Sequence, residues 1–140
     1  MNNPSITVII PAYNVERFVE ETIESVLSQQ SRANEIIVID DGSTDSTWSV
    51  IQKYANESGF KCLQTTNRGP GPTRNLGLGL ASSEYIYFLD GDDKISPELF
   101  KAARDAIVNH GSDLFLFSGE SFCDEEHDCT NLPRYCLGWV

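Results

Sequence analysis

Two short runs of β-branched residues limit the fold of this chain more than any other feature. Residues 5–10 and 35–39 are dominated by Ile and Val, which is typical of strands buried on both faces of a parallel sheet. A stretch with apolar residues at helical spacing, 15–30, lies between them. Parallel strands need such a crossover, so the pattern predicts an α/β fold with a mostly parallel sheet and helices on both faces.

The rest of the chain continues this alternation. Pro11 is predicted to end the first strand, and Asn14 to cap the first helix. The last helix is predicted to begin at Ser96 and Pro97 and to be terminated by Gly111. Further strands are predicted over 60–65, 85–88 (central and buried) and 113–117, and further helices from Trp48 to the terminating Gly59, over 73–80 and from Pro97 to about Asn109.

The alternating pattern ends near residue 118. Residues 1–118 are long enough for one domain with its own core, and we assign them to a single α/β domain. Residues 119–140 are acidic at first and show no clear period. We expect this tail to begin a further region that lies outside the chain.

Charge and composition exclude several classes of protein. The formal net charge of −11 argues against nucleic acid as a partner, because a phosphate-binding surface is basic. No run is apolar enough for a membrane-spanning helix, and the first residues do not resemble a signal peptide, so we expect a cytoplasmic protein. Its cysteines would then be reduced. Cys123, His127, Cys129 and Cys136 lack the close pairing of zinc ligands, so zinc is not expected.

Three carboxylates lie within four residues, at Asp90, Asp92 and Asp93, directly after the predicted strand 85–88. In open α/β sheets, ligands bind outside the carboxyl ends of the strands. Like charges this close repel, so a divalent cation is one interpretation. An acidic, solvated turn before a helix is the other.

Polar loops follow three of the predicted strands, at 11–14, 40–45 and 90–93. The carboxyl ends of parallel strands face the same way, so these loops should converge on one crevice. Asp41 either contacts a ligand there or caps the next helix. Tyr13 either stacks on a flat ring or closes its loop over the core. Arg74 either binds a diphosphate at a helix N-terminus or pairs with an acid on the surface.

Four motifs in order carry a resemblance to a known family. They are VIIPAYN at 8–14, IDDGSTD at 39–45, TRNLG at 73–77 and FLDGDD at 88–93. Their order and spacing over about residues 5–118 resemble those of glycosyltransferase family 2. The resemblance implies the GT-A fold, a Rossmann-like nucleotide-binding α/β domain. It also implies transfer of a sugar from a nucleotide-diphosphate donor, usually UDP-linked, with inversion at the anomeric carbon.

The resemblance also implies roles for residues in these motifs. Pro11 and Tyr13 would line the pocket for the base, and Asp41 would hold the base itself. Arg74 would lie beside the base or the diphosphate. Asp92 would approach the ribose, and Asp93 would hold a divalent cation, Mn²⁺ or Mg²⁺, with Asp90 nearby. A cation that bridges the diphosphate would stabilise the leaving group.

An inverting transferase also needs a general base for the acceptor hydroxyl. The acids of residues 119–140 match no motif for it, so we expect the base beyond Val140. We expect the same missing region to bind a saccharide or lipid-linked acceptor and to make any peripheral contact with the inner face of the membrane. The alternative is a non-catalytic nucleotide-sugar-binding or interaction module with the same fold. A receiver-like signalling domain has paired acids after its first strand. It is excluded, because here the acids follow the second and fourth predicted strands.

Overall fold

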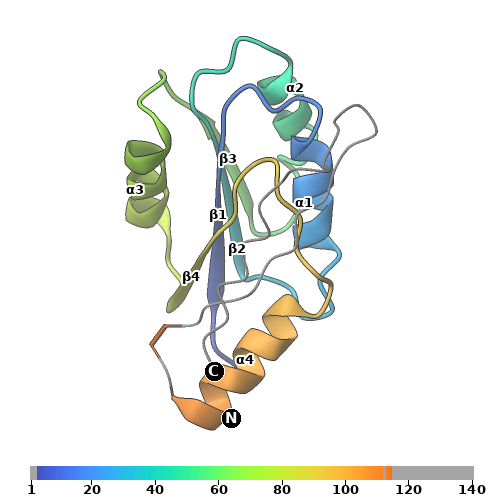
Figure 1. Ribbon diagram of the computed structural model, residues 1–140, viewed down its shortest axis with the longest axis vertical. Helices are drawn as coiled ribbons and strands as arrows, with labels where there is room; N and C mark the ends of the chain where they lie inside the picture. The colour runs from blue at the N-terminus through green and yellow to red at the C-terminus, as the bar shows by residue number, and fades with distance from the viewer. Residues whose placement is uncertain (1–2, 112, 115–140) are drawn as a thin grey trace, which may run out of the picture.

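The computed structural model describes residues 3–111 and 113–114. Four parallel strands form one sheet in the order β3-β2-β1-β4 (Figure 1). The strands are β1 Ile6–Ala12, β2 Glu35–Asp40, β3 Phe60–Gln64 and β4 Tyr85–Phe88. The helices are α1 Val19–Leu27, α2 Thr47–Gln52, α3 Pro70–Leu80 and α4 Leu99–His110. The predicted strand 113–117 lies largely outside the described residues, and the predicted tail lies entirely outside them.

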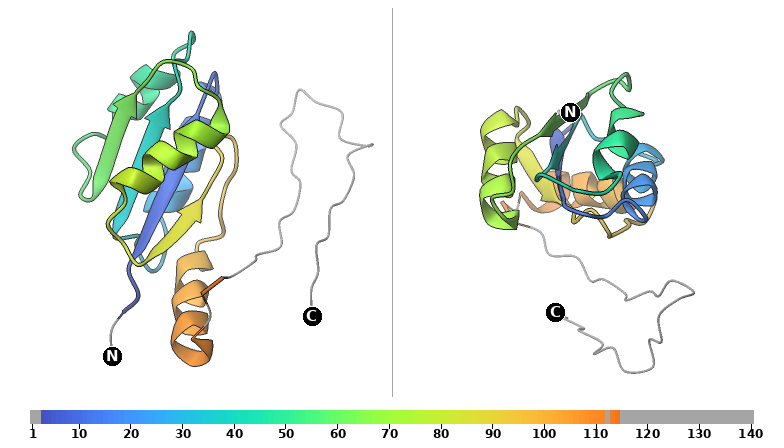
Figure 2. Two further views of the ribbon diagram at one scale, coloured as in Figure 1. Left: turned by 90° about the vertical axis from the view of Figure 1, so that its left-hand side faces the viewer. Right: turned by 90° about the horizontal axis from the view of Figure 1, so that it is seen from above.

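Helices cover both faces of the sheet, as predicted. Of the described helices, α3 packs on one face, while α1 and α2 lie on the other (Figure 2). Alternate residues of β1 serve the two faces: Val8 and Ile10 join the core beneath α1 and α2, whereas Ile9 faces Gly77 of α3. Helix α4 packs on the same side as α1 through Phe100. The centroid of its ring lies 5.6 Å from that of Tyr87, in an edge-to-face contact. No helix in the described ranges has the length and hydropathy to span a membrane.

Strand β1 runs through Pro11 to Ala12, so the prediction that Pro11 ends it is wrong. The Ile9 carbonyl accepts from Leu89 N at 3.1 Å, whereas the Ala12 carbonyl accepts from Asp41 N at 2.8 Å. Alternate residues of β1 therefore bond to opposite neighbours, and Pro11 points toward β4 as Ile9 does. Pairing with β4 stops at Ile9. The absent N–H of Pro11 thus breaks no hydrogen bond of the sheet.

Among the four described strands, β4 lies at the edge of the sheet. The predicted strand 113–117 lies largely outside the described residues, so the central position of 85–88 stays a prediction. Its residues are half-buried, and Phe88 is 41% exposed. The interior strands are β1 and β2, whose residues are almost all buried. Aromatic and β-branched composition shows that a segment is a strand, but the order of strands depends on the crossovers.

Helix α1 begins at Val19 and ends at Leu27, inside the predicted range 15–30. Asn14 does not cap it, because the residue before the helix is Phe18. The Asn14 side chain instead accepts a hydrogen bond from Thr44 N at 2.9 Å, in the loop after β2. Residues next to Asn14 in sequence contain no information on this distant partner.

The ends of the other helices also differ from the predictions. α2 stops at Gln52, well before Gly59, and α3 begins at Pro70, which is a favoured first position. α4 begins at Leu99 rather than at Pro97. The carbonyl of Pro97 accepts from Gln30 N at 2.9 Å, which ties the predicted first turn to the segment after α1. Gly111 ends α4 as predicted, with φ of 60°.

Candidate functional site

The loops after β1, β2 and β4 converge with the start of α3 around one open cavity of about 530 Å³. This convergence was predicted from the parallel sheet alone. The cavity contains every predicted donor-binding residue and one of the two predicted metal ligands: Pro11, Tyr13, Asp41, Arg74, Asp92 and Asp90. Asp93, the other predicted metal ligand, does not line it.

The loop that carries Tyr13 is locked to the loop after β2. Asn14 Oδ1 accepts from Thr44 N at 2.9 Å, and Ser43 Oγ accepts from Asn14 N at 2.9 Å. Asn14 has a φ of 51°, a conformation that Asn adopts more readily than most residues. The lock holds Tyr13, which is 47% exposed, at the mouth of the cavity. The ring is therefore available to a ligand rather than packed over the core.

The residue before α2 is Ser46, whose side chain makes no capping bond, and Asp45 holds the start of this helix instead. The Asp45 carboxylate accepts from Thr47 N at 2.9 Å and from Glu16 N at 3.2 Å. Burial alone would raise the pKa of Asp45, but its hydrogen bonds with Thr47 and the Glu16 amide outweigh burial and lower it. One carboxylate thus serves both the helix start and the loop from β1.

Asp41 is almost fully buried and supports the start of α3. Its two carboxylate oxygens accept from Arg68 N at 2.9 Å and from Gly69 N at 2.8 Å. Of the two predicted alternatives for Asp41, capping of α2 is therefore wrong, and contact with a ligand stays a prediction. The same carboxylate lines the cavity, and each of its oxygens keeps a lone pair for a further donor. The adjacent Gly42 has φ of 74°, and a Cβ there would lie 2.7 Å from Asn67 N.

Arg74 reaches across the cavity from α3 and pairs with Asp90 after β4. Of the two predicted alternatives for Arg74, the structure shows the pair with an acid, and that acid lines the same cavity. Binding of a diphosphate by Arg74 stays a prediction. Burial, then the charges of Asp92 and Asp90, raises the pKa of Asp93. Both causes disfavour the ionised form of Asp93, which a bound cation would favour. The segment after β4 that carries Asp90, Asp92 and Asp93 is called the acidic loop below.

The described residues do not form a ready-made metal cage, because no group of three Asp, Glu, His or Cys side chains converges among them. A hard cation such as Mg²⁺ commonly takes only one or two carboxylates and completes its shell with substrate phosphates and water. The acidic loop fits that mode of binding. The candidate zinc residues Cys123, His127, Cys129 and Cys136 lie outside the described residues.

Some residues that build the site were missed at the level of sequence. Thr22 lies on the buried face of α1, and its hydroxyl donates to the Gly91 carbonyl of the acidic loop at 2.9 Å. Ser25 and Gln29 hold later parts of the same loop. The available signal was polar residues at helical spacing on a face predicted to be buried, where each needs a partner.

Comparisons with known proteins agree with this geometry. The sequence model of the family described as "Glycosyl transferase family 2" matches residues 7–138. The chain is 39% identical over 114 residues to the poly(ribitol-phosphate) beta-N-acetylglucosaminyltransferase TarS of Staphylococcus aureus, and 40% identical over 130 residues to an uncharacterized glycosyltransferase of Haemophilus influenzae. It is 35% identical over 140 residues to the minor teichoic acid biosynthesis protein GgaA of Bacillus subtilis.

Solved structures of TarS share the fold of this chain. Crystal structures of S. aureus TarS 1-349 in complex with UDP-GlcNAc and with UDP each match with a TM-score of 0.73 at 39% identity. These matches cover 78% of this chain and 32% or 33% of the other. The sequence match to TarS covers 79% of this chain and 20% of TarS. The match to the Haemophilus protein covers 90% of this chain and 51% of that protein. The chain therefore spans only part of the length of these relatives. The family match over most of the chain, the shared fold and the converging motifs agree, and the chain belongs to glycosyltransferase family 2.

Proposed function

We propose that the cavity binds a UDP-linked sugar as the donor for transfer to an acceptor hydroxyl, with inversion at the anomeric carbon. The observation that carries the proposal is the meeting of an exposed aromatic ring, a buried carboxylate and an arginine around one cavity, at Tyr13, Asp41 and Arg74. Support comes from the TarS structures, which contain UDP-GlcNAc or UDP and share this fold at 39% identity.

The base of the donor would lie between β1 and the start of α3. Tyr13 offers a ring face for stacking, and Pro11 forms the wall beside it. Asp41 offers an acceptor for an N–H of the base while it continues to hold the backbone amides of Arg68 and Gly69. This double use explains why a carboxylate stands there rather than a simple loop residue.

The ribose and diphosphate would extend toward the acidic loop. Asp92 would accept from a ribose hydroxyl. Arg74 lies in the first turn and a half of α3, whose dipole favours an anion at the helix N-terminus. Pro70 and Pro72 have no N–H, so the guanidinium rather than the backbone would supply most of the donors to the phosphates. An arginine gives a phosphate two parallel donors, which makes it a suitable partner in a chain of net charge −11.

We assign Asp93, with Asp90 nearby, as the ligands of a Mn²⁺ or Mg²⁺ ion. The fit rests on the raised pKa of Asp93, which burial and the charges of Asp92 and Asp90 cause. Such an ion would neutralise charge on the departing diphosphate. A cation on Asp90 would also compete with Arg74 for that carboxylate and so free the guanidinium for phosphate.

The acceptor, in this proposal, is a saccharide or lipid-linked hydroxyl of cell-envelope polysaccharide synthesis. The name of GgaA, a minor teichoic acid biosynthesis protein, supports this class of acceptor. We place acceptor binding, the general base and any peripheral contact with the membrane outside the described residues.

Isothermal titration calorimetry with UDP tests the proposal directly. We expect binding in Mn²⁺ and much weaker binding in EDTA. At a hundredfold excess over Kd, UDP with Mn²⁺ should raise the free energy of unfolding by about 2.7 kcal/mol. Equal affinity in EDTA would refute the metal role alone, while no binding under either condition would refute the donor site. ADP in the same buffer is the control for selectivity toward the base.

A further inference from the structure

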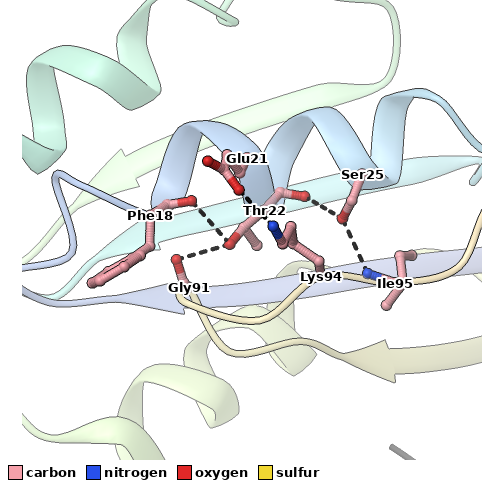
Figure 3. A network of polar contacts seen from close by, with 7 residues as sticks. All are labelled: Phe18, Glu21, Thr22, Ser25, Gly91, Lys94 and Ile95. Carbon is pink, nitrogen blue, oxygen red and sulfur yellow. Dashed lines mark hydrogen bonds and ion pairs between the residues drawn. The ribbon is translucent and has the colours of Figure 1, made fainter. Parts of the chain in front are cut away.

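Three polar side chains hold the acidic loop to α1 and the turn that follows it. Thr22 Oγ1 donates to the Gly91 carbonyl at 2.9 Å, and Ser25 Oγ accepts from Ile95 N at 3.3 Å. Further along, Gln29 Nε2 donates to a carbonyl of the same loop, that of Ser96, at 2.6 Å. In each of these three contacts the loop partner is a backbone group, so the contacts hold the path of the loop. Figure 3 shows those of Thr22 and Ser25.

Thr22 is the member of this set closest to the candidate site. Its side chain is fully buried, and the loop residue it bonds, Gly91, stands between Asp90 and Asp92 in the cavity wall. On its other side Gly91 lies against β1, where a Cβ would be 3.1 Å from the Pro11 carbonyl oxygen. Gly91 is therefore confined between the end of β1 and α1.

The hydroxyl of Thr22 is also 3.3 Å from the Phe18 carbonyl, the usual acceptor one turn earlier in a helix. The Gly91 carbonyl is nearer, at 2.9 Å. Ser25 Oγ donates to the Thr22 carbonyl at 2.7 Å while it accepts from Ile95 N, which links the two contacts into one network. An ion pair between Lys94 and Glu21, at 2.6 Å, joins the same loop to the same helix on its exposed side.

We propose that Thr22 is a positioning residue for the donor site. By holding the Gly91 carbonyl against α1, its hydroxyl turns the carboxylates of Asp90 and Asp92 toward the cavity. The folded protein holds the neighbouring carboxylates together despite their repulsion, so the loop is preorganised for the cation and the diphosphate. This inference rests on the proposed binding of a nucleotide-diphosphate donor.

Two substitutions at Thr22 separate its hydroxyl from its volume. Thr22→Val keeps the shape and removes the donor, while Thr22→Ser keeps the donor and removes a methyl group. Ile23→Val is the matched control, because Ile23 is the next residue of α1, is fully buried and lies in the apolar core. Ser25→Ala removes the acceptor of Ile95 N while it keeps the Thr22 hydroxyl, and serves as a second variant of the same loop.

The experiment measures two quantities for each variant of the full chain. Hydrogen exchange of the backbone amides of residues 91–95, without ligand, reports how firmly the loop is held. Calorimetry with UDP and Mn²⁺ reports affinity. We expect Thr22→Val to exchange faster in this segment and to bind UDP about tenfold more weakly, Ser25→Ala to change both in the same direction, and Thr22→Ser and Ile23→Val to stay near wild type.

Faster exchange with unchanged UDP affinity would overturn the proposal, because Thr22 would then be structural only. Exchange in Thr22→Val equal to that in Ile23→Val would overturn it as well, because the hydroxyl would not hold the loop. Failure of the wild-type chain to bind UDP in Mn²⁺ would refute the proposed function, and the positioning role with it. That failure is distinguishable, since it appears before any substitution is made.

Discussion

At the scale of the residue, Asp41 has two tasks whose effects can be separated. Asp41→Ala removes the acceptor for Arg68 N and Gly69 N, so the free energy of unfolding should fall by about 1–3 kcal/mol. If the same carboxylate also holds the base of the donor, UDP affinity should fall too, beyond the effect of lost stability. Chemical denaturation gives the first quantity, and calorimetry with UDP and Mn²⁺ the second.

The control for Asp41 is a variant of similar stability far from the cavity. Ile51→Val truncates a fully buried residue of α2 that packs in the core, and a change of this kind costs about 1 kcal/mol. We expect it to leave UDP affinity unchanged. If Asp41→Ala also binds UDP as well as wild type does, Asp41 supports the loop and does not contact the base.

At the scale of the element, the fit of α3 on the sheet depends on one glycine. A Cβ at Gly77 would lie 2.4 Å from Ile9 Cγ2 and 3.3 Å from Ile39 Cδ1, in the face of the sheet that α3 covers. Gly77→Ala should therefore push α3 outward and lower the free energy of unfolding by about 1–3 kcal/mol, as overpacking does. Because α3 carries Arg74, UDP affinity should fall as well.

The same helix contains its own control. A Cβ at Gly79 would meet nothing within 4 Å, and Gly79 lies only two residues further along α3. Gly79→Ala should raise the free energy of unfolding by about 0.5–1 kcal/mol, because alanine favours the helix over glycine. Thermal unfolding of the two variants side by side measures both effects. Equal stability of the two would show that the contact of Gly77 with the sheet does not limit the packing of α3.

At the scale of the whole molecule, Glu35 ties the sheet together at the end opposite the cavity. Burial would raise its pKa, but hydrogen bonds from Lys61, Thr7 and Ser82 outweigh burial and lower it. A lowered folded-state pKa means that the ionised form stabilises the fold above the unfolded pKa, and that this stabilisation is lost as the pH falls through the folded pKa. The contribution is thus complete at neutral pH, begins to decline near pH 4.5 and is lost as the pH falls further, through the lowered pKa of folded Glu35.

Glu35→Gln isolates this contribution from that of the other 20 acids, since the chain has 21 in all. We expect the variant to be less stable than wild type at pH 7, and the difference to shrink as the pH falls from 5 toward 3. Urea denaturation at a series of pH values measures it. A difference that stays constant over this range would contradict a role for the ionised carboxylate, and a difference that grows would reverse the sign of its pKa shift.

The sequence by itself determined the elements that depend on near neighbours. Continuous β-branched runs placed β1 and β2 and predicted parallel pairing, because such runs suit a sheet covered on both faces. Gly111 ended α4 as predicted, because the left-handed conformation favours glycine wherever it occurs. Convergence of Tyr13, Asp41 and Asp90 on one cavity followed from the common direction of parallel strands.

Tertiary structure decided what depends on partners distant in the chain. Asn14 does not cap a helix but accepts a hydrogen bond from Thr44, 30 residues away. Thr22 donates to the carbonyl of Gly91, 69 residues away. Pro11 remained in β1 because β4 stops pairing before it. Each backbone N–H or carbonyl takes whichever partner the fold brings near, and a local pattern contains no information on that competition.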